Sequence, residues 1–172
     1  WSYHEHDPDG MSAGDELSLA IKRVARWYKA FPKADVCIGN HDRLASRKAF
    51  SGGVPKAWIK GYNEVLKTPK WNWVENVTYD NVCYEHGEGG DAYRKAQQNM
   101  QSSVCGHTHT KSGVQYYVGK CYKVFGMQIG CGVDSTSYAA AYARNFKRQA
   151  IGVGVVINGS TAINVLMELG KK

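Results

Sequence analysis

The chain has 172 residues, of which 43% are hydrophobic and 22% charged, and its formal net charge is +7. This length is enough for one folded domain, and this balance of residue types excludes a disordered or fibrous protein. No apolar run reaches the ~18 residues that a membrane-spanning helix needs, and the first residues lack the pattern of a signal peptide.

The positive charge is concentrated in the second part of the sequence. From Ser103 onward, eight Lys or Arg residues stand against Asp134 and Glu168, so this part carries +6. Such a surplus favours an anionic substrate, either a phosphorylated small molecule or a nucleic acid. The five cysteines lie far apart and form no CxxC pair, which predicts reduced, buried thiols in a cytoplasmic protein. Since no apolar run could span a bilayer, no association with membranes is expected.

The first half of the chain alternates helical and strand-like patterns. Apolar residues recur at helical spacing over Asp15 to Phe31, which predicts an amphipathic helix that Pro32 ends. The apolar run "ADVCI" then predicts a short buried strand before "GNHD". Residues 44–66 are expected to form one or two short helices, interrupted by glycines and by Pro55.

The second half is dominated by strands. Aromatic and β-branched residues in "WNWVENVTYDNVCYEHGEGG" predict two strands, and a helix over Asp91 to Met100 precedes a strand at "SSVC". The remaining apolar runs predict antiparallel strands, with Asn158-Gly159 as a hairpin turn. The sequence therefore predicts one α/β (α+β) domain over residues 1–172, in which mixed β-sheets form a sandwich flanked by helices.

Three of the apolar strands end directly in residues that bind metals well, in "VCIGNHD", "VCYEHGEGG" and "SVCGHTH". Ligands gather beyond the carboxyl ends of strands in α/β sheets, so we expect the polar residues of these segments to meet in one place. These residues are Asn40, His41, Asp42, His86, His107 and His109. His107 and His109 alone could equally be surface imidazoles, whereas the recurrence at three strand ends favours a metal site. Imidazole suits Zn, Fe, Ni and Mn, and an amide oxygen suits a harder ion.

These motifs resemble the signature of the calcineurin-like metallophosphoesterases. "GNHD" at 39–42, His86 before Gly87, and "GHTH" at 106–109 are similar in order and spacing to the last three motifs of that family. The resemblance implies a sandwich fold and a site for two divalent metal ions (Mn, Fe, Zn or Ni). It also implies hydrolysis of a phosphomonoester or phosphodiester, in which a metal-bound hydroxide attacks the phosphorus.

The resemblance also implies a role for each matching residue. Asn40, His86 and His107 would hold one metal, and His109 would help to hold the other. His41 would act on the phosphate as the catalytic residue, by stabilising charge or protonating the leaving oxygen. Arg43, directly after the motif, could contact substrate phosphate or could be an exposed arginine at a helix start.

The family's first two motifs, an Asp-x-His and a strand-ending Gly-Asp, supply carboxylate ligands that this chain lacks. Asp15 could replace the bridging carboxylate, but Asp15 or Ser12 fits better as the cap of the helix that follows. We therefore expect the chain to lack the first β-α-β unit of the fold.

For some further residues the sequence allows two interpretations. The cluster of His4, His6, Asp7 and Asp9 is either a solvated loop or a rim that faces substrate. Basic residues in "YAAAYARNFKRQ" either lie on a solvated helix face or contact nucleic acid beside tyrosines; these are Arg144, Lys147 and Arg148. Trp58, Trp71 and Trp73 are expected to pack in the core or in a lid.

The leading functional hypothesis is a metal-dependent hydrolase of phosphoric esters. One alternative is a nuclease of the same family, which the basic second part of the chain favours. The other is a noncatalytic binding scaffold with an incomplete metal site, which the absent carboxylates favour.

Overall fold

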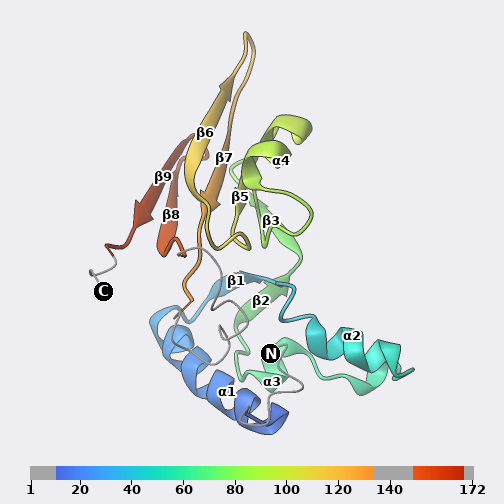
Figure 1. The fold of residues 1–172 in the computed structure, drawn as a ribbon. Coiled ribbons are helices and arrows are strands. Elements are labelled where there is room, and N and C mark those ends of the chain that lie inside the picture. The colour runs from blue at the N-terminus through green and yellow to red at the C-terminus, as the bar shows by residue number, and fades with distance from the viewer. Residues whose placement is uncertain (1–10, 134–148, 169–172) are drawn as a thin grey trace. The chain divides into compact units, whose positions relative to one another are not determined.

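The computed structural model describes residues 11–133 and 149–168 and shows an α+β chain with helices and mixed sheets (Figure 1). The chain divides into two compact units, one ending at Val74 and the other beginning at Glu75. None of the described helices is both long and apolar enough to cross a lipid bilayer. The sequence analysis predicts that residues 1–172 fold as one domain, and for the two units this stays a prediction.

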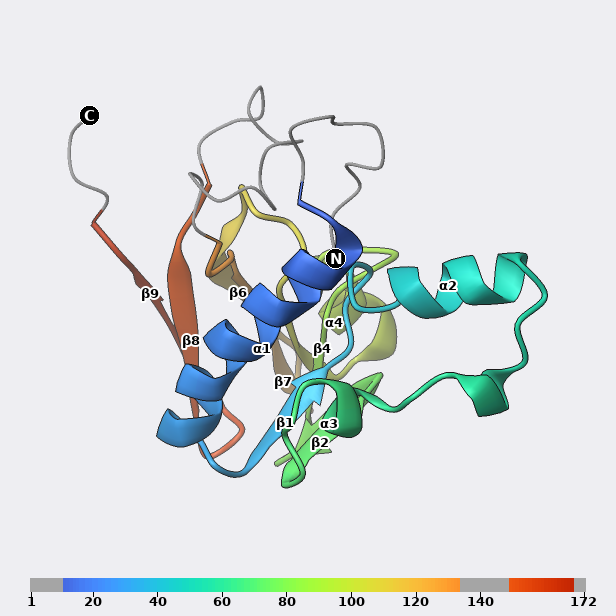
Figure 2. The same cartoon turned by 90° about the horizontal axis from the view of Figure 1, so that it is seen from below.

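The first unit combines a pair of short parallel strands with helices (Figure 2). Its elements are α1 (Ala13–Ala30), β1 (Ala34–Cys37), α2 (Leu44–Ser51), the 3-10 helix η1 (Lys56–Trp58), α3 (Tyr62–Val65) and β2 (Trp71–Val74). Tyr28 of α1 packs edge-on against Trp71, and the Trp71 indole N–H donates to the Phe31 carbonyl at 2.7 Å. These contacts hold α1 against the β1–β2 pair.

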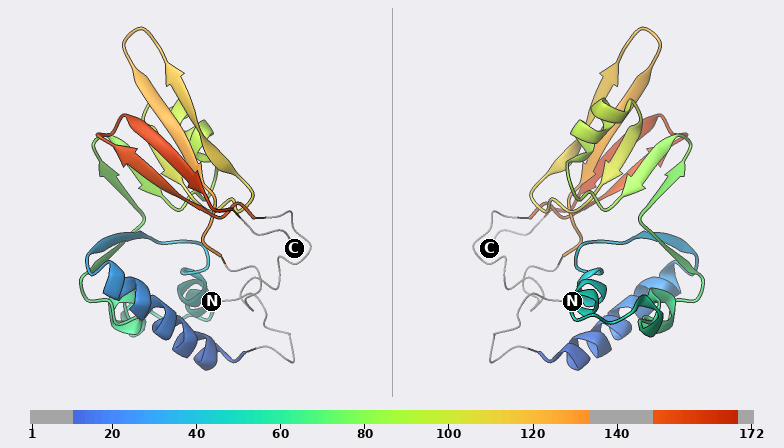
Figure 3. Two further views of the ribbon diagram at one scale, coloured as in Figure 1. Left: turned by 90° about the vertical axis from the view of Figure 1, so that its left-hand side faces the viewer. Right: turned by 90° about the vertical axis from the view of Figure 1, so that its right-hand side faces the viewer.

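The second unit is built on a five-stranded mixed sheet in the order β3-β4-β5-β7-β6. Its elements are β3 (Asn76–Tyr79), β4 (Val82–Glu85), α4 (Ala92–Asn99), β5 (Ser102–Cys105), β6 (Ser112–Val118), β7 (Lys123–Ile129), β8 (Gly152–Ile157) and β9 (Thr161–Leu166). The three central strands β4, β5 and β7 are parallel, and β3 and β6 pair antiparallel at the edges. Figure 3 shows α4 on one face of this sheet and the β8–β9 hairpin on the other.

The core of the second unit lies between the sheet and the β8–β9 hairpin. Val82, Val104, Phe125 and Met127 form its buried cluster, and side chains of the hairpin pack against them. On the opposite face, a Cβ on Gly126 would lie 2.5 Å from the Ala92 carbonyl oxygen. Glycine at this position therefore lets α4 approach the sheet closely.

Most of the predicted elements are confirmed, including the long first helix, the helix after Asp91 and the antiparallel ending. Asn158 and Gly159 both have positive φ, at 49° and 63°, as the predicted hairpin turn requires. The prediction of two strands between Trp71 and Glu85 is wrong, because the structure has three, β2 to β4. Asp80 and Asn81 adopt the same left-handed conformation, at 48° and 62°, and make a second tight turn.

Burial differs from the prediction at several positions. The residues of β1 are half-buried instead of buried, since its sheet has only two strands. Trp58 is 83% exposed, so its predicted core packing is wrong, whereas Trp71 is buried and Trp73 stacks on Tyr62. All five cysteines are free thiols, as predicted, but Cys105 alone is buried and Cys121 is exposed.

Candidate metal-binding site

Two of the predicted ligands, His86 and His107, lie side by side at the ends of adjacent parallel strands. His86 follows β4 and His107 follows β5 after one glycine, and the register pairs Glu85 with Cys105 directly before them. Parallel neighbours deliver their carboxyl ends to the same edge of a sheet, which is the reason these segments were expected to meet. The structure thus brings together two imidazoles that are 21 residues apart in sequence.

The two rings are in direct contact. His86 Nε2 lies 3.0 Å from His107 Nδ1, and the ring planes meet edge-on with centroids 4.9 Å apart. His107 is exposed and His86 is half-buried, so the pair is open to solvent on one side. Two ring nitrogens at this distance either share a proton in a hydrogen bond or both face one metal ion.

The backbone turns that carry the two rings are tied to each other. The Gly106 N–H donates to the His86 carbonyl at 3.1 Å, which extends the β4–β5 ladder by one bond. Gly87 has φ +105°, and a Cβ there would lie 2.9 Å from Cys105 Cβ. His107 itself is left-handed, with φ +60°, and its conformation is therefore less favourable than that of an ordinary residue. The pair is held by a shared, closely packed backbone.

Lys95 of α4 holds the turn that carries His86, and Gln128 of β7 holds the turn that carries His107. The Lys95 ammonium is 2.6 Å from a Glu85 carboxylate oxygen and donates to the Glu88 carbonyl at 3.0 Å, so it contacts the chain before and after His86. Gln128 of β7 donates through its amide nitrogen to the Gly106 carbonyl, directly before His107. The sequence analysis missed both residues. The available signal was a polar glutamine inside the apolar run "KVFGMQIG".

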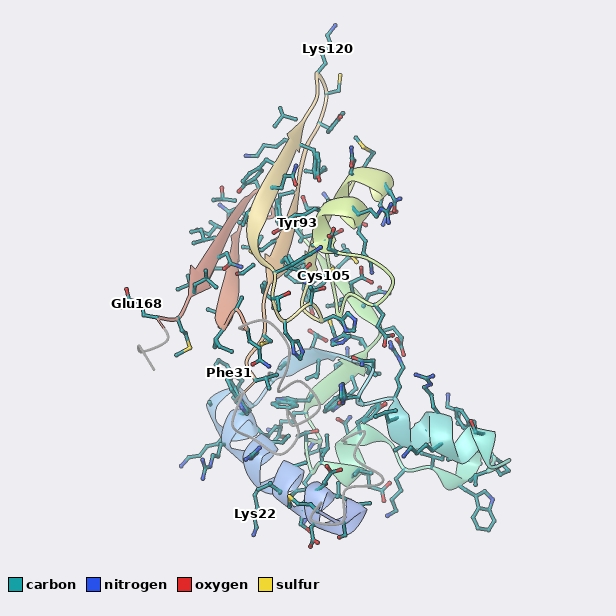
Figure 4. All side chains as sticks on the ribbon, viewed as in Figure 1. Lys22, Phe31, Tyr93, Cys105, Lys120 and Glu168 are labelled. Carbon is teal, nitrogen blue, oxygen red and sulfur yellow. The ribbon has the colours of Figure 1, made fainter. Side chains whose placement is uncertain are left out.

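The electrostatics of the surroundings favour neutral thiols and ionised carboxylates. Burial raises the pKa of the Cys105 thiol to about 12, and the nearby Glu85 carboxylate adds to the rise (Figure 4). A hydrogen bond from Lys111 holds the pKa of the Asp91 carboxyl below its ordinary value. Cys105 is therefore protonated at neutral pH and is a poor metal ligand in this state.

The histidine pair fits a divalent ion as two of its ligands. Two nitrogens that are each ~2.1 Å from one ion lie ~3 Å apart when the angle between them is near 90°. Within residues 11–133 and 149–168, no group of three or more His, Cys, Asp or Glu side chains is placed to hold a metal. The described part of the chain therefore holds two candidate ligands, His86 and His107, and no complete metal site.

Asn40, His41 and Arg43 lie in the first unit, in the turn that follows β1. The Asp42 carboxylate accepts the Gly39 N–H at 2.8 Å, and the Tyr62 hydroxyl donates to the Asp42 carbonyl at 3.1 Å, so Asp42 holds this turn together. Arg43 is the N-cap residue of α2, at a helix start as one interpretation had it, but it is half-buried instead of exposed. β1 pairs with β2 in a sheet separate from that of β4 and β5. The meeting of Asn40 and His41 with the histidine pair stays a prediction.

The remaining candidates are placed as follows. The His109 carbonyl accepts the Ala150 N–H at 2.7 Å, which joins the loop after β5 to the segment before β8. Ser12 caps α1, as its Oγ accepts from the Asp15 N–H at 3.1 Å and donates to the Asp15 carboxylate at 2.7 Å. The capping interpretation is confirmed. The cluster at residues 4–9 and the basic group at residues 144–148 lie outside the described residues.

No protein-family model, curated protein or solved structure matches this chain. The chemistry of the histidine pair at the strand ends is therefore the main indication of function.

Proposed function

We propose that this protein is a metal-dependent hydrolase of phosphoric esters with a fold of the calcineurin-like metallophosphoesterase type. The observation that carries the proposal is the 3.0 Å approach of His86 Nε2 to His107 Nδ1 at the ends of two parallel strands. The two residues come from separate motifs of the family signature, and their meeting is what that signature requires.

The roles of the residues are those that the resemblance implies. His86, His107 and Asn40 would hold one metal, and His109 would help to hold the other. When bound, a divalent ion supplies positive charge that polarises a phosphoryl oxygen. His41 binds the phosphate and holds or delivers a proton at the leaving oxygen.

The charge balance calls for carboxylates that the histidine pair does not provide. A divalent ion on two imidazoles keeps its full charge, and burying it requires anionic ligands. Glu85, directly before His86, is paired with Lys95, and Asp91 is paired with Lys111.

The proposal predicts that three histidine substitutions separate metal binding from turnover. His86→Ala and His107→Ala should each weaken Mn²⁺ binding by about 100-fold or more, because each removes a direct ligand. His41→Ala should keep the metal while slowing hydrolysis of an aryl phosphate. Metal content after dialysis and release of the aryl alcohol measure the two effects. Equal metal loss in all three variants would refute the assigned roles, and less than one bound metal per wild-type chain would favour a noncatalytic scaffold.

A nuclease activity is the second candidate, and one feature of the second unit favours it. No Asp or Glu occurs from Ala92 to Val133, while five Lys or Arg residues do. Such an acid-free segment attracts a polyanion more strongly than a small phosphate ester. Single-stranded DNA and an aryl phosphate, each incubated with the Mn²⁺-loaded protein, distinguish the two substrates.

A further inference from the structure

Gln128 is a fully buried polar residue near the end of the largely apolar strand β7. Its side chain is 0% exposed, and both ends of its amide are used. The amide nitrogen donates to the Gly106 carbonyl, and the amide oxygen accepts the Ala92 N–H at 3.1 Å. Gln128 thus connects the turn before His107 with the first residue of α4.

The bond to Gly106 acts on the backbone of His107 directly. The Gly106 carbonyl oxygen lies in the peptide plane that leads into His107, so fixing that oxygen fixes the orientation of this plane. The φ angle of His107 describes rotation about the next bond, and it is held at +60°. This left-handed conformation costs an ordinary residue ~1 kcal/mol or more. The Gly106 carbonyl also accepts the Thr108 N–H at 2.6 Å, so the bond from Gln128 adds to a local turn around His107.

Gln128 is itself held on its backbone side. Asn164 of β9 donates through its amide nitrogen to the Gln128 carbonyl at 2.8 Å. The Ser112 hydroxyl of β6 lies 2.7 Å from the Asn164 amide oxygen. These contacts connect both faces of the sheet with the Gly106–His107 turn, and the side chains of Gln128, Asn164 and Ser112 are each at least partly buried.

We infer that Gln128 is a positioning residue for the histidine pair: it fixes the Gly106–His107 peptide so that His107 Nδ1 faces His86 Nε2. The consequence for metal binding rests on the proposed function: metal affinity depends on Gln128, a residue that does not touch the metal. Outer residues that orient metal-binding histidines typically contribute about 10- to 100-fold to affinity.

Two substitutions separate the two bonds of the Gln128 amide. Gln128→Met keeps the length of the side chain and removes both bonds. Gln128→Glu, when ionised, still accepts the Ala92 N–H but cannot donate to Gly106. Ser103→Ala is the matched control, because Ser103 is a buried polar residue of β5 whose hydroxyl bonds to the Gln101 carbonyl instead.

The readouts are NMR cross-relaxation between the His86 and His107 ring protons in metal-free protein, and calorimetric Mn²⁺ affinity. Wild type and Ser103→Ala should show the ring contact, and both Gln128 variants should lose it with 10- to 100-fold weaker Mn²⁺ binding. Ring contact that persists in both variants would overturn the inference.

A measurement on the wild type keeps the inference testable should the variants not fold. The Gln128 side-chain amide protons should exchange slowly with solvent and show cross-relaxation to the His107 backbone N–H. Rapid exchange would overturn the inference. Should the ring contact depend on Gln128 while the wild type binds no Mn²⁺, the positioning role stands and the proposed function fails.

Discussion

Left-handed residues carry much of the local geometry around the histidine pair. Gly87 is one of them, with φ +105°. Gly106 is not, and the left-handed conformation falls on His107 next to it. Sequence alone does not show this, because one of the bonds that hold the Gly106–His107 peptide comes from Gln128, a residue of another strand.

Replacement of Gly87 by Ala tests the cost of this geometry. The new Cβ would lie 2.9 Å from Cys105 Cβ in a conformation that disfavours any side chain, so Gly87→Ala should lower the free energy of unfolding by about 2–4 kcal/mol. Urea unfolding measures the change. Gly132→Ala is the matched control, since nothing lies within 4 Å of its Cβ position. Equal effects of the two substitutions would contradict the account of the Gly87 turn.

At the level of elements, α4 is the part of the fold that places the candidate site. Its existence could be predicted, because Asp91 is a good cap and accepts the Arg94 N–H at 3.0 Å. Its docking could not. The contacts of Lys95 with Glu85 and of Gln128 with Ala92 join elements far apart in sequence, and no local pattern encodes such pairs.

The Lys95–Glu85 ion pair should contribute measurably to stability. Its side chains are 17% and 24% exposed, so removal of Lys95 leaves a largely buried carboxylate without its partner. We expect Lys95→Met to cost about 2–3 kcal/mol in urea unfolding, and Lys95→Met with Glu85→Gln to cost less than Lys95→Met alone.

The control for this prediction is an exposed pair of the same kind. Lys60 and Glu64 are 69% and 60% exposed, so Lys60→Met should change stability by less than ~0.5 kcal/mol. A cost for Lys95→Met as small as that for Lys60→Met would show that the α4 anchor contributes little to stability.

Strand pairing marks the limit of the sequence prediction for the whole chain. The strands at "ADVC", "VCYE" and "SSVC" are each four residues long and similarly apolar, so nothing in them specifies a partner. The structure pairs β4 with β5 but places β1 with β2 in another sheet. The adjacency of the strand ends after β4 and β5 therefore follows the strand-end rule, whereas the pairing of β1 with β2 could not be predicted from the sequence.

The difference in apolar burial between the two compact units predicts the order in which they unfold. The second unit has a continuous buried cluster of Val82, Val104, Phe125 and Met127. Among the described residues of the first unit, the buried apolar side chains are those of Leu44 and Trp71. Because burial of apolar surface is the main source of stability, we expect the first unit to unfold at a lower urea concentration.

The distribution of tryptophan allows the two transitions to be observed separately. All five tryptophans precede Val74, so their fluorescence reports on the first unit, whereas methyl NMR signals of Val104 and Met127 report on the second. The fluorescence midpoint should come at lower urea than the methyl midpoint. Coincident midpoints would confirm the single-domain prediction instead, because two probes in different units follow one curve only when the units unfold together. In that case the stability that the first unit lacks on its own must come from association with the second.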